Sequence, residues 1–92
     1  MTIRFTLTAA RQIEGALDEI TSQSPQGAHS VRERLLAVLT MLSIYPHAGR
    51  PTTKAGVRRI VVNPYPYLVD YSAVGDDIIV RRFRHAARRP VA

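Results

Sequence analysis

The stretch from Val57 to His85 constrains the fold most, because it contains three runs of β-forming residues separated by turn signals. Each run is rich in Val, Ile, Tyr or Phe, which are enriched in strands. The breaks hold Asn63-Pro64 and Val74-Gly75-Asp76-Asp77, which contain the residues that tight turns require. The pattern predicts an antiparallel meander of three strands.

The residues before this meander predict one strand and two helices. Residues 2–7 alternate polar and apolar side chains, which is typical of a half-buried strand. Thr8 can cap a helix whose apolar residues recur every three or four positions. Ser24 and Pro25 then supply the cap and the first residue of a second helix, which ends at Pro46. Helices joined by so short a link should form a hairpin that packs on the sheet.

The predicted fold class is therefore α+β, with an N-terminal strand and an antiparallel helix hairpin packed on an antiparallel sheet (β-α-α-β-β-β), followed by a basic C-terminal tail. A chain of 92 residues fits a single domain over residues 1–92. It contains no cysteine, no signal-peptide pattern and no window approaching the roughly 20 apolar residues of a membrane span. We expect a cytoplasmic protein.

The second half of the chain carries the whole net charge of +6. Bases and acids balance through Tyr45, whereas nine bases face three acids from Pro46 onward. Eight of those nine bases are arginine, whose guanidinium binds phosphate or carboxylate as a fork. The distribution favours an acidic partner, whether nucleic acid, an acidic protein or an anionic surface.

Arginines gather at the end of the last predicted strand. In a regular strand Arg81 and His85 share one face and Arg82 lies on the other. A guanidinium on the face that meets the helices needs a partner, and Asp70 on the middle strand is a candidate. Either the strand end holds a salt bridge and solvated arginines, or it forms an anion-binding surface. The residues of that surface would be Arg81, His85, Arg88 and Arg58.

The sequence contains no nucleophile–base pair, metal-ligand spacing or glycine-rich phosphate loop. Its three histidines lie far apart, so we expect no metal site and no cofactor. His85 is a plausible general base, but it stands alone.

The second helix has a wider apolar stripe than one sheet contact requires. The additional apolar residues either touch the first helix or form an exposed groove for a partner helix. Under the second interpretation, and with an arginine of the following loop, the partner-binding residues are Leu36, Leu39, Met41 and Arg50.

Several segments in this order resemble the RelE/ParE superfamily of toxins from type II toxin-antitoxin systems, often labelled plasmid stabilisation proteins. Besides the first strand and the helix hairpin, they are Pro46-x-x-Gly49-Arg50, Gly56-Val57-Arg58, Tyr65-Pro66-Tyr67-Leu68-Val69-x-Tyr71 and Arg81-x-x-x-His85-x-x-Arg88. The resemblance covers nearly the whole chain and is closer to the ParE branch. It implies a growth-inhibiting cytoplasmic toxin and a cognate antitoxin that wraps it.

The resemblance implies one of two mechanisms. RelE-like members are ribosome-dependent mRNA endonucleases that use an arginine on the strand corresponding to residues 67–71 and often a tyrosine or histidine near the C-terminus. This sequence has no Arg or Lys between Tyr65 and Ser72, and no tyrosine after Tyr71. The residues that stand near positions used by such nucleases are Arg58, Arg81 and His85.

ParE-like members instead inhibit DNA gyrase without being enzymes, and this is the function we expect. The residues expected to contact the target are Arg81, His85, Arg88 and Arg89. The mRNA endonuclease remains the first alternative. A non-enzymatic, basic nucleic-acid-binding module remains the second, although no helix-turn-helix or RNA-stacking signature is evident.

Overall fold

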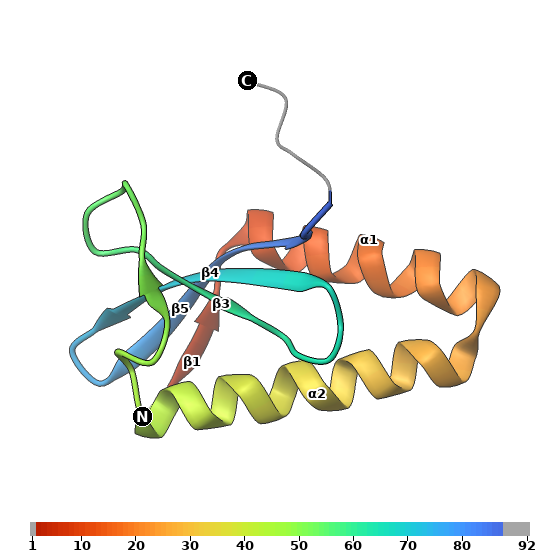
Figure 1. The fold of residues 1–92 in the computed structure, drawn as a ribbon, viewed down its shortest axis with the longest axis horizontal. Helices are drawn as coiled ribbons and strands as arrows, with labels where there is room; N and C mark the ends of the chain where they lie inside the picture. The colour runs from red at the N-terminus through yellow and green to blue at the C-terminus, as the bar shows by residue number, and fades with distance from the viewer. Residues whose placement is uncertain (1, 88–92) are drawn as a thin grey trace.

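The computed structural model describes residues 2–87, and the expected basic tail with Arg88 and Arg89 lies outside the described residues. Figure 1 shows a helix hairpin beside a sheet. The elements in chain order are β1 (Ile3–Phe5), α1 (Leu7–Gln23), α2 (Pro25–Ile44), β2 (Arg50–Pro51), β3 (Arg58–Val61), β4 (Tyr67–Val74) and β5 (Asp77–His85). The predicted α+β class and element order are confirmed.

The strands form one sheet in the order β1-β5-β4-β3-β2, so the first strand, β1, lies beside the last, β5 (Figure 1). Strands β2 to β5 pair antiparallel, as the meander predicts, and β2 adds a short strand that was not predicted. β1 runs parallel to β5, with Ile3 beside Ile78, so the sheet is mixed and not wholly antiparallel. A parallel pair needs a long connection, and here the hairpin and most of the meander supply it.

The first helix starts two residues earlier than predicted because Thr6, and not Thr8, caps it. The Thr6 hydroxyl accepts a hydrogen bond from the backbone N–H of Ala9 at 3.1 Å. The same hydroxyl donates to the backbone carbonyl of Arg81 at 3.1 Å, which ties the start of α1 to β5. Leu7 therefore begins the helix and is 66% exposed, where the alternating pattern placed it on the buried face of a strand.

The junction of the two helices follows the prediction. Ser24 ends α1, and its hydroxyl accepts a hydrogen bond from the backbone N–H of Gly27 at 3.0 Å to cap α2. Pro25 occupies the first turn of α2, where its missing N–H has no partner to lose. Within residues 2–87, neither helix combines the length and apolar character that crossing a membrane requires.

The hairpin covers one face of the sheet and closes the core. Apolar side chains from α2 meet those of β4 and β5 there, and the tyrosine and phenylalanine among them are the largest fully buried side chains. The principal members of this core are Leu35, Leu39, Leu42, Val69, Tyr71, Val80 and Phe83.

A β-bulge interrupts the pairing of β4 with β5. Tyr71 pairs with Val80, and the preceding residue Asp70 pairs with Arg82, so Arg81 is an extra residue in β5. A bulge of this kind reverses the alternation of side chains that follows it. The prediction that Arg81 and His85 share one face is therefore wrong, because it assumed a regular strand.

The bulge decides which side chains face the helices. Phe83 is 2% exposed in the core, and His85, two residues further on, lies on the same face. Arg82 and Arg84 alternate with them and point to the face of the sheet that the helices do not cover. We call this second face the open face.

Candidate functional site

A groove of about 850 Å³ lies between α2 and the β2–β3 edge of the sheet, and we call it the α2–β3 groove. Its lining combines an apolar floor with cationic side chains and includes no carboxylate among the described residues. The apolar residues are Val38, Met41, Ile60, Val61 and Leu68. The charged residues are Arg34, Arg50 and Arg59.

The α2–β3 groove brings together two of the four predicted partner-binding residues, Met41 and Arg50. Leu36 is 52% exposed but is not among the lining residues. Leu39 is 1% exposed and lies in the core, so the prediction that it contacts a partner directly is wrong. The buried arc of α2 is wide because the helix packs against both α1 and the sheet, and Leu39 lies within that arc.

A buried tyrosine anchors the loop that leads into this groove. The Tyr71 hydroxyl accepts a hydrogen bond from the backbone N–H of Gly49 at 2.9 Å and donates to the carbonyl of Pro46 at 2.8 Å. A Cβ on Gly49 would lie 2.7 Å from the Tyr71 hydroxyl oxygen and 2.9 Å from the Arg59 carbonyl oxygen. Position 49 requires glycine because Tyr71 and the Arg59 carbonyl approach its Cα too closely for a side chain. The two hydrogen bonds of Tyr71 explain why Pro46 and Gly49 occur at this spacing in the Pro46-x-x-Gly49-Arg50 segment. The regular alternation of Tyr67, Val69 and Tyr71 was the available signal for a buried hydroxyl that needs partners.

Arg58 binds the same loop and lies apart from His85. Its guanidinium donates to the carbonyl of Gly49 at 2.9 Å and to that of His47 at 3.4 Å. In the register of the sheet Arg58 pairs with Tyr71, whereas His85 pairs with residue 67, four residues along β4. At roughly 3.3 Å per residue, these positions are about 13 Å apart.

His85 belongs to an aromatic cluster at the end of β5. Its ring meets Tyr67 edge-on at 5.4 Å between centroids, and Tyr67 stacks on Phe83 at 5.0 Å. The Nδ1 atom of His85 accepts a hydrogen bond from the backbone N–H of Ala87 at 3.1 Å. In the neutral ring the proton therefore lies on Nε2, and Nδ1 is already engaged as an acceptor.

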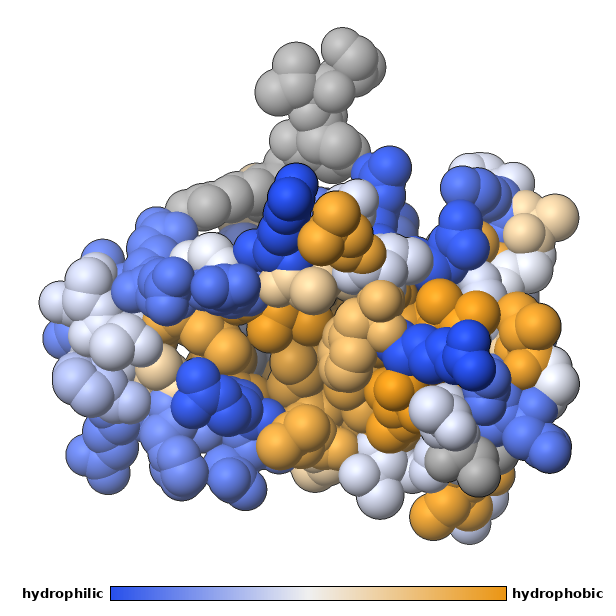
Figure 2. All heavy atoms as spheres, turned by 180° about the vertical axis from the view of Figure 1, so that it is seen from behind, coloured by the Kyte–Doolittle hydropathy of each residue, from blue (hydrophilic) through white to orange (hydrophobic). Residues whose placement is uncertain are grey.

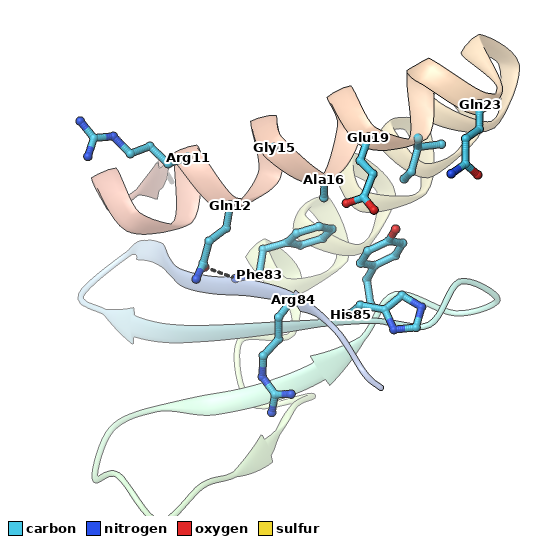
Figure 3. A pocket seen from close by; sticks show the side chains of 11 residues that line it. Arg11, Gln12, Gly15, Ala16, Glu19, Gln23, Phe83, Arg84 and His85 are labelled. Carbon is cyan, nitrogen blue, oxygen red and sulfur yellow. Dashed lines mark hydrogen bonds between the residues drawn. The ribbon is translucent and has the colours of Figure 1, made fainter. Parts of the chain in front are cut away.

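This cluster forms one wall of a cleft of about 640 Å³ between α1 and β5, which we call the α1–β5 cleft. Figure 3 shows Glu19 extending from α1 toward the sheet, and Arg84 pointing away from α1. Gln12 closes one end, because its side-chain oxygen accepts a hydrogen bond from the backbone N–H of Phe83 at 2.9 Å (Figure 3). The cleft thus lies where β5 extends beyond the short strand β1.

The structure does not bring the nuclease candidates together. His85 lies on the helix-covered face, and Arg81 lines a different cleft, together with Arg82 and Asp70. Arg58 pairs with Tyr71 in the middle of β4 and donates to loop carbonyls. Among residues 2–87, no three His, Asp or Glu side chains gather as a metal site would require.

Asp70 pairs with Arg59 of β3, where the sequence suggested an arginine of the last strand. Arg59 Nε donates to Asp70 Oδ1 at 2.7 Å and Arg59 Nη2 donates to Oδ2 at 3.1 Å, so the pair is bidentate. The hydrogen bonds and charge of Asp70 raise the pKa of Arg59 against the opposing effect of burial. Asp70 lies opposite Arg59 on the neighbouring strand β3 and opposite Arg82 on the neighbouring strand β5. Its salt bridge is with Arg59.

The described surface also exposes several large apolar side chains. Figure 2 shows one face of the molecule on which hydrophobic residues gather across the middle, with hydrophilic residues around them. A contiguous apolar patch of this kind often marks a surface that a partner covers, whereas single exposed apolar residues are common on any protein. The large apolar side chains that are more than 40% exposed are Phe5, Leu7, Leu36, Ile44, Tyr45, Val61 and Val74.

Comparison with known proteins gives consistent results. A sequence model of the family described as "ParE toxin of type II toxin-antitoxin system, parDE" matches residues 3–90. The "Putative toxin Y4kP" of Sinorhizobium fredii (strain NBRC 101917 / NGR234) is 30% identical over 84 residues, which cover 91% of this chain and 86% of that protein.

A solved structure shares the fold. It is described as "Chromosomal ParDE TA system from P. aeruginosa" and superposes with a TM-score of 0.77 at 22% identity, covering 92% of this chain and 95% of that chain. The family match spans nearly the whole chain and agrees with the predicted resemblance. This chain belongs to the ParE toxin family of type II toxin-antitoxin systems.

Proposed function

We propose that this chain, acting as a single domain over residues 1–92, stops bacterial growth in the cytoplasm by inhibiting DNA gyrase. The separation of Arg58, Arg81 and His85 carries the choice of gyrase over messenger RNA. An RNA-cleaving site has to place a base, an acid and phosphate-stabilising cations around one phosphodiester. Arg81 lies on the opposite face of the sheet from His85, and Arg58 binds loop carbonyls about 13 Å along β4 from the residue that pairs with His85, so the three groups do not supply that arrangement.

Target binding asks less of the same residues. Arg81 and His85, with Arg88 and Arg89 of the segment outside the described residues, need only make surface contacts with gyrase. Arg81 and His85 lie on opposite faces of the C-terminal half of β5, four residues apart in sequence, so a target that binds along this half of the strand could touch both. No proton transfer is required of His85, whose Nδ1 is engaged with Ala87.

The α2–β3 groove is the proposed seat of the neutralising antitoxin. An amphipathic segment could bury apolar side chains against Met41 and its neighbours while its carboxylates meet Arg34 and Arg50 at the rim. Arg34 is already held in place, because its Nε donates to the carbonyl of Asn63. A fixed guanidinium loses less side-chain entropy on binding than a free one.

Induction of the chain in bacterial cells tests the target. We expect growth arrest, loss of plasmid supercoiling and a DNA-damage response, with full-length messenger RNA. Co-expression of the antitoxin should restore growth. Normal growth with folded protein present would contradict the toxin proposal, and messages cut at ribosomal A sites would contradict the choice of gyrase.

A matched pair of variants distinguishes the proposed site from general charge. Arg81→Ala should weaken growth arrest, because it removes a target contact. Arg32→Ala removes the same charge from an exposed position on α2 and should leave growth arrest unchanged. Equal activity of the two variants would remove Arg81 from the target surface.

A further inference from the structure

The open face of the sheet contains a cleft of about 360 Å³ that is unlike the two sites above, and we call it the cationic cleft. Charged side chains from the loop before β3 and from β3, β4 and β5 converge on it. These side chains are Lys54, Arg59, Asp70, Arg81 and Arg82. The cleft therefore holds four bases and one acid.

The acid is already neutralised inside the cleft. Both carboxylate oxygens of Asp70 accept hydrogen bonds from Arg59, at 2.7 and 3.1 Å. Lys54, Arg81 and Arg82 remain, and none of these three forms an ion pair within 4.0 Å among residues 2–87. The three positive charges around this cleft repel each other, and a bound anion would reduce that repulsion.

The β-bulge builds this concentration of charge. Consecutive residues of a regular strand point to opposite faces, so Arg81 and Arg82 would be separated by the sheet. The bulge inserts Arg81 as an extra residue, and both arginines line the same cleft. Bulges next to functional sites commonly re-aim a side chain in this way.

The start of α1 adds neutral donors to the same hollow. Thr6 and Thr8 line the cleft from the helix side, and Thr52 and Thr53 line it from the loop after β2. The hydroxyls of Thr6 and Thr52 already donate to backbone carbonyls, so the hydroxyl donors offered to a ligand are those of Thr8 and Thr53. The first turn of α1 carries no acidic side chain, so the positive end of the helix dipole is not offset there. Hydroxyls and helix N–H groups are the usual neutral partners of phosphate oxygens.

We propose that the cationic cleft binds a phosphate group of a nucleic acid strand. A peptide would also bring anions, but peptide docking relies on apolar anchor pockets. The cleft offers only Val57, which is 7% exposed, whereas the α2–β3 groove has an apolar floor. Because the cationic cleft is lined by polar donors and has little apolar surface, it suits a phosphate better than a peptide. This assignment does not rest on gyrase being the target.

Binding of a short fluorescein-labelled single-stranded DNA to the purified full chain tests the proposal by anisotropy. Arg81→Ala/Arg82→Ala should weaken binding about ten- to hundred-fold, because two charged hydrogen-bond donors are lost. It should also lower the slope of log affinity against log salt by about 0.7, the value for the loss of one phosphate contact on a single strand. Arg11→Ala/Arg32→Ala removes the same net charge elsewhere and should change affinity less than three-fold.

A second measurement locates the ligand and identifies its chemistry. Inorganic pyrophosphate should displace the DNA and shift the backbone amide signals of Thr6, Thr8, Arg81 and Arg82, which line this cleft and not the α2–β3 groove, whereas an acidic peptide without phosphate should not. If the double variant does not fold, Lys54→Glu on the exposed loop provides the same test. Unchanged DNA affinity in a folded variant, equal loss in the control, or cleft shifts with the peptide alone would overturn the proposal.

Discussion

The α2–β3 groove and the cationic cleft both draw on the excess of arginine in the second half of the chain, yet their surroundings differ. The groove sets three arginines around five apolar side chains. The cleft sets its bases among threonine hydroxyls and one buried valine. A cation close to apolar surface suits an amphipathic protein segment, whereas a cation among hydroxyls suits a phosphate. The lining of a site therefore indicates the partner better than the total charge does.

The two sites also arise from different backbone devices. The groove depends on a loop held by Tyr71 and Gly49, while the cleft depends on the bulge at Arg81. A change that disturbs one device should leave the other site in place. The predictions below test that independence, from the largest expected effect to the smallest.

Gly49→Val should have the largest effect. Its side chain would collide with the Tyr71 ring and the Arg59 carbonyl, and overpacking of this kind destabilises by about 3 kcal/mol. Urea denaturation should show the loss in the free energy of unfolding. Gly15→Ala is the control, because a Cβ there meets no atom within 4 Å and helix propensity predicts a gain of about 1 kcal/mol. A Gly49→Val variant as stable as the parent would contradict the close approach.

Tyr71→Phe should act on the groove more mildly. It keeps the ring but leaves the Gly49 N–H and the Pro46 carbonyl without their partner, which costs about 2 kcal/mol. We expect weaker antitoxin binding and unchanged DNA binding at the cationic cleft, measured by calorimetry and anisotropy. Loss of both activities in a folded variant would show that the two sites are coupled.

Arg50→Glu and Arg82→Glu should have reciprocal effects. Reversing Arg50 should lower antitoxin affinity about ten-fold, or about 1.4 kcal/mol, because a rim cation becomes repulsive. Reversing Arg82 should leave antitoxin affinity within about two-fold while abolishing DNA binding. The reverse pattern would exchange the assignments of the two sites.

Asp70→Asn should produce the smallest change, about 1 kcal/mol of stability, and that change should not depend on pH between 6 and 9. Pairing with Asp70 raises the pKa of Arg59 above its ordinary value, and a raised pKa of a base contributes stability below the unfolded pKa. That contribution is lost only as pH rises through the folded pKa of Arg59, far above this window. Thermal unfolding at pH 6 and pH 9 measures it, and a change that grew or shrank between these values would implicate another group.

Local signals in the sequence predicted much of the fold. The Ser24-Pro25 junction, the helix hairpin and the pairing of β3, β4 and β5 depend on caps, periodicity and turns that short segments specify. The bulge at Arg81 was missed because a strand pattern assumes regular alternation, and only pairing with β4 reveals the extra residue. Thr6 was missed as a cap because its second hydrogen bond reaches Arg81, 75 residues away.

The candidate sites were less predictable than the fold. Met41 and Arg50 were correctly identified as residues that line the groove. The sequence could not show that Leu39 is buried, because that depends on α2 packing against both α1 and the sheet. Asp70 was recognised as an arginine partner, although the register of β3 was needed to select Arg59. Long-range pairing, which residue patterns express weakly, accounts for these errors.

Titration of the purified chain into a DNA gyrase supercoiling reaction, alongside a translating-ribosome extract, tests the proposed function most directly. We predict inhibition of supercoiling at near-stoichiometric concentrations, relief by the antitoxin, and intact messenger RNA in the extract. Message cleavage with unimpaired supercoiling would contradict the proposal and would restore Arg58, Arg81 and His85 as catalytic candidates.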